Sequence, residues 1–317
     1  MPPPSFEVVH EHARTHPPAV FRQRPAGPVS ARSADGAADR PIKGALLLVL
    51  GEGLLAVMAA MIKHLSDTMP VEVIVFGRNL LGLTVLLPIL VASGGIRDLR
   101  TGHLGLHFIR GFTGVSAMFC FFYTIAHIPL AEAVLVKMTV PFFLPLVAWL
   151  WLGDRISGHT WLAILIGFVG VGVILQADRG AVDPVMLVAL AGAMIMSIAK
   201  VSIRRMAASE PPHRVVFYFS LFATLFSALL LLRVRQWPSA EEALWMLGIG
   251  AVAIGGQFAM TTAYQIARPG QVGVYNYSAV VWAALLGWVF WGETLVLTTV
   301  LGTLLIIGAG IWNLKTR

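Results

Sequence analysis

Ten apolar runs of about 20 residues, almost free of charge, constrain the fold of this 317-residue chain more than any other feature. An α-helix rises about 1.5 Å per residue, so about 20 apolar residues cross a hydrocarbon core of about 30 Å. The gaps are short, which favours antiparallel neighbours. We therefore predict an all-α integral membrane protein with ten transmembrane helices, over residues 44–65, 71–92, 105–125, 131–152, 160–176, 185–203, 213–232, 243–264, 271–291 and 295–312.

The composition also indicates that lipid is the solvent around these helices. Charged residues make up 12% of the chain and hydrophobic residues 57%, whereas a soluble domain carries about 25% charged residues. The runs lack the alternation of barrel strands, which excludes a transmembrane β-barrel. The net charge of +7 comes largely from the gaps and the N-terminal segment. Such a distribution is typical of membrane orientation, so we predict no nucleic-acid partner.

The Lys and Arg residues of the gaps predict how the chain is oriented. If the N-terminus is cytoplasmic, nine lie on the inner side and three on the outer side. Positive residues concentrate on the cytoplasmic side, so we predict a multi-pass protein of the cytoplasmic membrane with both termini inside. The inner residues are Arg97, Arg100, Arg155, Arg204, Arg205, Arg214, Arg268, Lys315 and Arg317, and the outer ones are Arg179, Arg233 and Arg235.

Residues 1–43 differ from the rest of the chain. They contain eight prolines and no apolar core segment, so they do not form a secretory signal and we predict a disordered cytoplasmic tail. His10, His12 and His16 are close enough in sequence to hold a metal. We favour a solvated tail with incidental histidines and predict no metal site and no cofactor.

The two halves of the membrane part resemble each other. Tyr-x-Ile-Ala precedes a short turn at Tyr123 and at Tyr264, and a Gly-acid pair ends a later helix at 153–154 and at 292–293. Each half, 44–176 and 185–312, holds five predicted helices. Because five is odd, tandem units must insert in opposite directions, and inverted repeats of this kind are typical of secondary transporters.

The chain resembles EamA-type members of the drug/metabolite transporter superfamily over residues 44–312. The resemblance rests on the PLAEA segment at 129–133, the run 141–152 followed by Gly-Asp-Arg at 153–155, and Gly-Glu at 292–293. The family commonly has Gly-Glu-Arg in place of Gly-Asp-Arg, and the second half has no match for Pro141 and Pro145. The resemblance implies transport without ATP through a central cavity. The first four and the sixth to ninth helices would line that cavity, with the fifth and tenth at the periphery.

Three charged side chains lie deep in the predicted helices, where a charge costs about 2.5–3.5 kcal/mol. Glu52 lies near the middle of its helix, with Ala56, Ala59, Ala60 and Lys63 on the same face. We interpret Glu52 as a carboxylate that couples protons or binds a cation. The alternative is a structural pair with a buried arginine.

The other two deep charges are cations. Arg78, followed by Asn79, requires an anion, which is either Glu52 or a substrate. Lys137 lies one turn before Pro141, which predicts a bend, and it either holds an anionic group of the substrate or reaches outward to the interface. Arg110 and Lys200 lie close enough to helix ends for their side chains to reach the interface, and so does Glu72.

Polar residues also follow single helix faces. Ser116, Cys120 and Tyr123 share one face, and Gln257, Thr261 and Tyr264 share another. These stripes either line one cavity or form hydrogen bonds between helices. A third patch would stack on a planar or cationic solute, and it comprises Tyr275, Asn276, Tyr277, Ser278 and Trp282.

These features predict a secondary active transporter that works by alternating access. Its substrate would be a small anionic or zwitterionic metabolite, resembling an amino acid or a nucleoside, moved by ion or proton coupling or by exchange. The chain lacks HExxH and GxSxG, so we expect no enzyme, and it lacks a selectivity-filter segment. An intramembrane enzyme and a channel remain the alternatives, and the sequence leaves a homodimer open.

Overall fold

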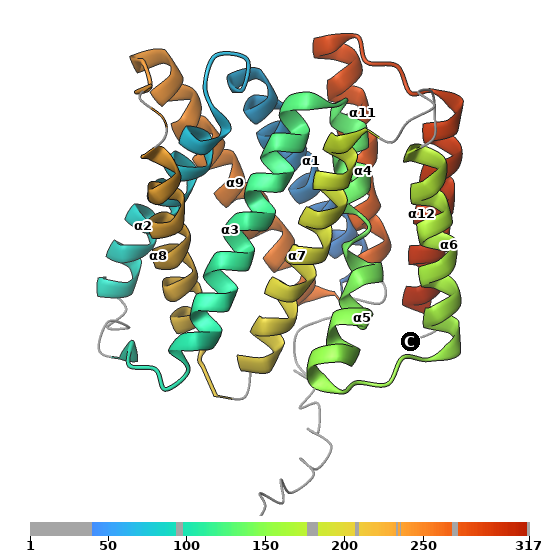
Figure 1. The fold of residues 1–317 in the computed structure, drawn as a ribbon, viewed down its shortest axis with the longest axis horizontal. Helices are drawn as coiled ribbons and strands as arrows, with labels where there is room; N and C mark the ends of the chain where they lie inside the picture. Colours follow the sequence, from blue (N-terminus) through green and yellow to red (C-terminus); the bar gives the residue numbers. More distant parts are fainter. Residues whose placement is uncertain are drawn as a thin grey trace, which may run out of the picture. The chain divides into compact units, whose positions relative to one another are not determined.

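The fold is described from a computed structural model. It covers residues 40–92, 98–175, 183–206, 209–232, 234, 236–267 and 272–315, without a few side chains that include those of Thr261 and Tyr264. The histidines at 10, 12 and 16 lie outside these residues. The described part is helical throughout and contains no strand, as expected (Figure 1).

The helices follow the predicted runs closely. Their bounds are α1 Pro41–Leu65, α2 Val71–Ala92, α3 Leu104–His127, α4 Leu130–Lys137, α5 Val140–Leu152, α6 Gly158–Leu175, α7 Pro184–Met206, α8 Pro212–Leu231, α9 Ala240–Ile266, the 3-10 helix η2 Gly273–Tyr277, α11 Ser278–Trp291 and α12 Leu297–Lys315.

Eight segments are long and apolar enough to cross a membrane. They are α1, α2, α3, α4 with α5, α7, α8, α9, and η2 with α11. The shorter apolar stretches of α6 and α12, 158–174 and 297–313, complete the set of ten. These two helices pack against each other, and Figure 1 shows them side by side.

The predicted bend before Pro141 is confirmed. The helix is interrupted between Lys137 and Val140, because the proline ring cannot donate to the preceding turn. Ser197 of α7 donates to the carbonyl of Val140, the first residue of α5, at 3.2 Å. The second half is interrupted too, since the 3-10 helix η2 leads into α11, although no proline stands there.

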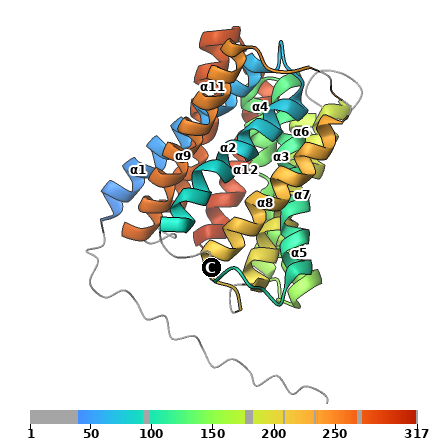
Figure 2. The same ribbon diagram turned by 90° about the vertical axis from the view of Figure 1, so that its left-hand side faces the viewer.

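Glycines allow the most extensive helix pairs, α1 with α9 and α3 with α7, to approach closely (Figure 2). A Cβ added to Gly51 would lie 3.1 Å from the carbonyl oxygen of Gly256, and one on Gly192 would lie 2.7 Å from the Cβ of Cys120. In lipid, no hydrophobic force drives helices together. Small residues let the helices pack closely, and that close packing holds them together instead.

The repeated Gly-acid pairs end two helices. Gly153 after α5 has φ +74° and Gly292 after α11 has φ +64°, the left-handed conformation that favours glycine at a helix C-terminus. Each glycine turns the chain out of its helix. The C-terminal ends of α5 and α11 lie at opposite ends of the bundle (Figure 1). Asp154 and Glu293 directly follow these glycines, so they lie at opposite ends as well.

Candidate functional site

Five charged side chains from five helices form one group, which we call the central charge cluster. It comprises Glu52 (α1), Arg78 (α2), Arg110 (α3), Lys137 (α4) and Lys200 (α7). Glu52 is 5% exposed and interacts electrostatically with Lys137 and Lys200. Lys200 also interacts with Arg110, and Arg110 with Arg78. The cluster therefore places four cations around one carboxylate.

None of these cations has a carboxylate within 4.0 Å among the described residues. Arg110 lies 4.0 Å over the Phe219 ring, and Lys137 lies 4.6 Å over Phe121. Such cation–π contacts stabilise a cation only partly. The structural alternative for Glu52 and Arg78, an ion pair between them, is not formed.

Arg78 instead donates to its neighbour Asn79 at 3.3 Å. Two donors close by have no partner in the described part of the chain, the buried Nδ2 of Asn79 and Nε of Arg110. Buried polar atoms of proteins are nearly always hydrogen-bonded. Both donors are therefore available to an acceptor from outside the chain.

Sequence reasoning placed Arg110 and Lys200 at the interface and missed their place in the cluster. The helix α7 ends at Met206 rather than at the expected residue 203, which leaves Lys200 six residues from the end, or about 9 Å at 1.5 Å per residue. A longer run for this helix, which the chain allows, would have placed Lys200 farther from the helix end, where its side chain is exposed.

The tyrosine of the first polar stripe lies away from the cluster. Tyr123 stacks on His127 with ring centroids 4.0 Å apart. It lines a hollow of about 320 Å³ with Ser66 and Glu72, beside the turn between α1 and α2. Thirteen residues separate it from Arg110 on α3, or about 20 Å.

Of the two predicted polar stripes, the structure describes all of the first but only Gln257 of the second. Cys120 faces α7 at Gly192, and α9 packs along α1. Gln257 is exposed, and the side chain of Tyr264 lies outside the described residues.

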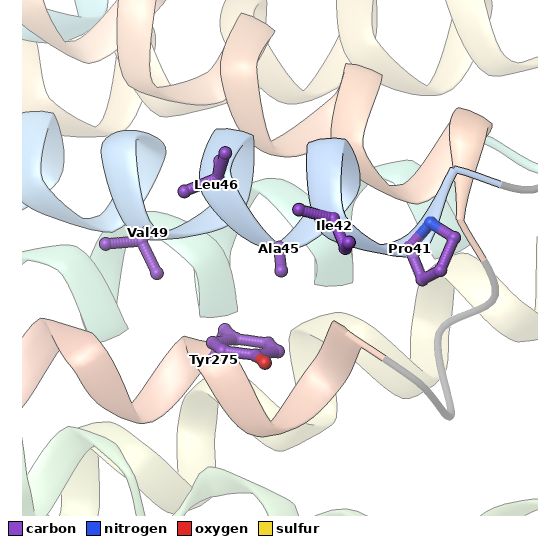
Figure 3. Close-up of a pocket in the computed structure, with 6 residues that line it drawn as sticks. All are labelled: Pro41, Ile42, Ala45, Leu46, Val49 and Tyr275. Atoms are coloured by element: carbon purple, nitrogen blue, oxygen red, sulfur yellow. The ribbon is translucent and has the colours of Figure 1, made fainter.

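Two aromatic residues of the third patch, Tyr275 and Trp282, pack against α1, and Tyr277 lies against Gly310 of α12. Tyr275 on η2 faces Ala45, Leu46 and Val49 across a hollow of about 250 Å³ (Figure 3). The indole of Trp282 donates to the carbonyl of Val49 at 3.1 Å and lies against Gly53. Asn276 is half-buried on the same 3-10 helix. Trp282 thus ties α11 to α1.

One end of the bundle, which we call the Lys63 end, is held by a nearly buried ion pair. Lys63 of α1 pairs with Glu293 beyond α11, and their side chains are 13% and 15% exposed. Lys63 also donates to the carbonyl of Ile128 at 2.9 Å, and Glu293 accepts from the N–H of Leu130 at 2.8 Å. The pair therefore joins three segments, from α1, the α3–α4 turn and the α11–α12 turn.

The opposite end, the Arg204 end, has an exposed counterpart. Arg204 of α7 contacts Asp154 beyond α5 at 3.0 Å, with side chains 63% and 39% exposed. The neighbouring Arg205 reaches the carbonyl of Trp151 at 3.4 Å. This pair joins two segments and remains in contact with solvent.

A buried carboxylate also lies at the Arg204 end. Glu210 accepts from Thr101 at 2.6 Å and from Arg214 at 2.8 Å, and Arg214 also contacts Asp98 at 2.7 Å. Burial acts to raise the pKa of Glu210, but the hydrogen bonds from Thr101 and Arg214 and the arginine charge outweigh it and hold that pKa below its usual value. The network fixes α8 to the segment before α3.

Comparison with known proteins assigns the fold to a family. The sequence profile of the EamA-like transporter family matches residues 42–176 and again 183–314. The chain belongs to the EamA-like transporter family. An EamA relative, the pseudopaline exporter CntI of Pseudomonas aeruginosa, is 33% identical over 276 residues, which cover 86% of this chain and 96% of the relative.

More distant EamA relatives cover most of the chain as well. The riboflavin transporter of Vibrio cholerae is 25% identical, and the match covers 80% of this chain and 86% of the transporter. Human solute carrier family 35 member G1 is 24% identical, and the match covers 86% of this chain and 78% of the human protein. A crystal structure with 25% identity superposes with a TM-score of 0.57 over 86% of this chain and 95% of the other.

Family and fold together make the chain a multi-pass membrane protein of a transporter family. The named relatives are transporters and exporters, which supports transport of a small molecule and favours it over catalysis.

Proposed function

We propose that this EamA-like protein is a secondary active transporter that moves a small anionic or zwitterionic metabolite across the cytoplasmic membrane. The observation that carries the proposal is the central charge cluster, whose four cations lack a carboxylate partner among the described residues. Arg78, Arg110 and Lys137 are half-buried and Lys200 is exposed, and a partly buried cation without a counter-ion is destabilising. An anionic solute would supply the missing charge when it binds.

The proposed architecture is a pair of inverted five-helix repeats, 44–176 and 185–312, after a cytoplasmic tail. The helix packing supports it, since α1 pairs with α9 as α7, its counterpart, pairs with α3. The double match of the family profile supports it as well. Helices α1 and α7 run in opposite directions (Figures 1 and 2), as inversion requires.

Alternating access would then use the two ends in turn. In the conformation described, the Lys63 end is tied by a nearly buried pair and the Arg204 end by an exposed one. Lys63 and Glu293 would separate when the protein opens on that side. We propose that the Arg204 end lies in the cytoplasm, and the excess of Lys and Arg in the gaps on that side supports this.

Within the cluster, Glu52 would couple transport to a proton or cation, and Arg78, Asn79 and Lys137 would hold the anionic part of the solute. Tyr123, Gln257, Tyr264, Tyr275, Asn276 and Trp282 were predicted from the same polar patterns, and their part in transport stays a proposal. The 33% identical relative is an exporter, so export is the direction to test first.

The test is a metabolite screen followed by transport in proteoliposomes. Cells with and without the protein are compared for exported and imported metabolites, and a compound that differs is used for counterflow. We expect saturable counterflow, which separates a carrier from a channel, and an unaltered compound, which separates it from an enzyme.

Variants then test the cluster itself. Arg78→Gln and Lys137→Gln should each lower uptake at least tenfold, whereas Arg155→Gln, the same kind of change at an exposed site, should leave it unchanged. Equal uptake by all three variants would remove the cluster from the mechanism.

A further inference from the structure

A hollow at the Lys63 end lies apart from the central charge cluster. Its volume is about 320 Å³, at the lower end of ligand pockets, which span about 300–1,000 Å³. The C-terminal part of α3 forms one wall, and the turn from α1 to α2 with the first residues of α2 forms the other. A space of this size can receive one small head group.

The α3 wall is a column of three stacked rings. Phe119, Tyr123 and His127 follow each other at four-residue spacing, so they lie on one face of the helix. The ring centroids of Tyr123 and His127 are 4.0 Å apart, and those of Phe119 and Tyr123 are 6.5 Å apart, with interplanar angles of 28° and 18°. Aromatic faces are electron-rich and attract cations, so this wall favours a positively charged ligand.

The opposite wall contributes a carboxylate. Glu72 lies in the first turn of α2 and is half-buried. It has no hydrogen-bond or ion-pair partner within the part of the chain that the structure describes. Stabilisation of the helix N-terminus explains an acid in this turn, but it does not explain why the acid shares a hollow with three rings.

His127 adds an acceptor to the hollow. Its Nδ1 lies 2.8 Å from the carbonyl oxygen of Tyr123. A carbonyl only accepts, so Nδ1 carries the proton, and the Nε2 of the neutral ring is left as an acceptor. Among the described residues that line the hollow there is no Lys or Arg. The lining therefore suits a cation and disfavours an anion.

The hollow is connected to the ion pair of the Lys63 end. Ser66, which lines the hollow, donates to the carbonyl of Lys63 at 2.7 Å. Lys63 in turn donates to the carbonyl of Ile128, the residue after His127, at 2.9 Å. A ligand held between Glu72 and the rings would join the same two segments that Lys63 joins, and so would stabilise this end in its closed arrangement.

We propose that this hollow is a second binding site, which takes an organic ammonium group between Glu72 and the ring column of Phe119, Tyr123 and His127. Free protonated or quaternary amines and the amine head groups of phospholipids share this chemistry. The site is independent of the central charge cluster and of the solute that the protein is proposed to transport.

A matched pair of probes tests the charge of the ligand. Choline and 3,3-dimethylbutan-1-ol have nearly the same shape, and only choline is charged. Binding of radiolabelled choline and of radiolabelled ethanolamine is measured on the full-length protein at pH 8 and constant ionic strength, in nanodiscs of phosphatidylglycerol, which has no amine. We expect saturable binding of at least one amine, displaced by unlabelled choline at a concentration at least tenfold below that of the neutral alcohol. Equal displacement by the two compounds would overturn the inference.

Variants locate the bound amine. Glu72→Gln should weaken binding at least tenfold, and Tyr123→Leu at least threefold, whereas Tyr123→Phe keeps the ring and should stay within twofold of the wild type. Glu72→Asp keeps the charge and should bind more tightly than Glu72→Gln, which separates a lost charge from poor folding. Glu241→Gln, the same change at an exposed acid in the first turn of α9, should leave binding unchanged.

The lipid of the nanodisc distinguishes the two sources of the amine. If a phospholipid head group is the ligand, replacing phosphatidylglycerol with phosphatidylethanolamine should weaken choline binding at least threefold and raise the thermal unfolding midpoint, and Glu72→Gln should remove both differences. If a free amine is the ligand, choline should bind equally in the two lipids.

Two further results would overturn the inference. One is choline binding that is lost in Glu52→Gln and kept in Glu72→Gln, which would place the cation in the central charge cluster. The other is the absence of saturable binding of either amine, together with the same thermal midpoint in both lipids. Neither result bears on counterflow of the transported solute, so the proposed function would stand.

Discussion

At the Lys63 end, an ion pair with side chains 13% and 15% exposed joins three segments, whereas at the Arg204 end the corresponding pair is 63% and 39% exposed and joins two. The residue types and their places are otherwise alike, since each pair links the last turn of a helix to the acid that follows a left-handed glycine. The difference lies in burial.

Burial decides what such a pair does energetically. An exposed pair contributes about 0–1 kcal/mol, because water screens the charges and the side chains lose entropy. A buried pair costs about 3–5 kcal/mol to break, because the remaining charge is left without a partner. Under the proposed alternating access the two pairs would exchange environments, and the more buried pair would mark the Lys63 end as the closed one.

The largest effect is expected from Glu293→Gln. The amide still accepts from the N–H of Leu130 but leaves Lys63 with one carbonyl partner, so the free energy of unfolding should fall by about 2–4 kcal/mol, a little below the range for a fully buried pair. Denaturant unfolding in mixed micelles measures it. A change below about 1 kcal/mol would mean that the Lys63 pair is no tighter than an exposed one.

The interaction itself can be isolated with a double-mutant cycle. Lys63→Gln and Glu293→Gln, alone and together, should show an interaction energy of about 1–3 kcal/mol, because the residues are in direct contact. The matched cycle with Asp154→Asn and Arg204→Gln should give less than about 0.5 kcal/mol. Equal values in the two cycles would contradict the difference between the ends.

A substitution at Glu210 tests whether all charged contacts at the Arg204 end contribute little to stability, or only the exposed pair of Arg204 and Asp154. The folded pKa of Glu210 lies below its usual value, so its stabilising effect is fully present above the unfolded pKa, about 4.3. That effect is lost as the pH falls from there through the folded pKa, because the unfolded chain binds the proton first. Glu210→Gln should lower the free energy of unfolding at pH 7 by about 1–2 kcal/mol.

The pH dependence identifies the carboxylate as the cause. The difference in thermal midpoint between the wild type and Glu210→Gln should hold above about pH 5 and shrink as the pH falls from about 4.3 toward 3. A constant difference across that range would assign the effect to lost packing rather than to charge.

The smallest effect is expected from Asp154→Asn. Removing the charge from an exposed pair should change the free energy of unfolding by less than about 1 kcal/mol, and raising the salt concentration to about 1 M should remove what remains. Glu293→Gln serves as the comparison, since its effect should persist in salt.

The sequence alone determined the features that depend on near neighbours in the chain. Ten apolar runs set the helices, Pro141 interrupts one of them, and Gly153 and Gly292 end two others. Each follows from the backbone chemistry of a few consecutive residues and from the thickness of a bilayer.

Only the tertiary structure decided which side chains meet. Lys63 and Glu293 are 230 positions apart, and Arg110 and Lys200 join the cluster because α3 and α7 pack closely at Gly192. Tyr123 contacts His127 and Trp282 contacts Val49, and the sequence predicted neither contact. Helix rotation and the choice of packing partner fix these contacts, and both depend on the sum of many weak contacts between distant residues.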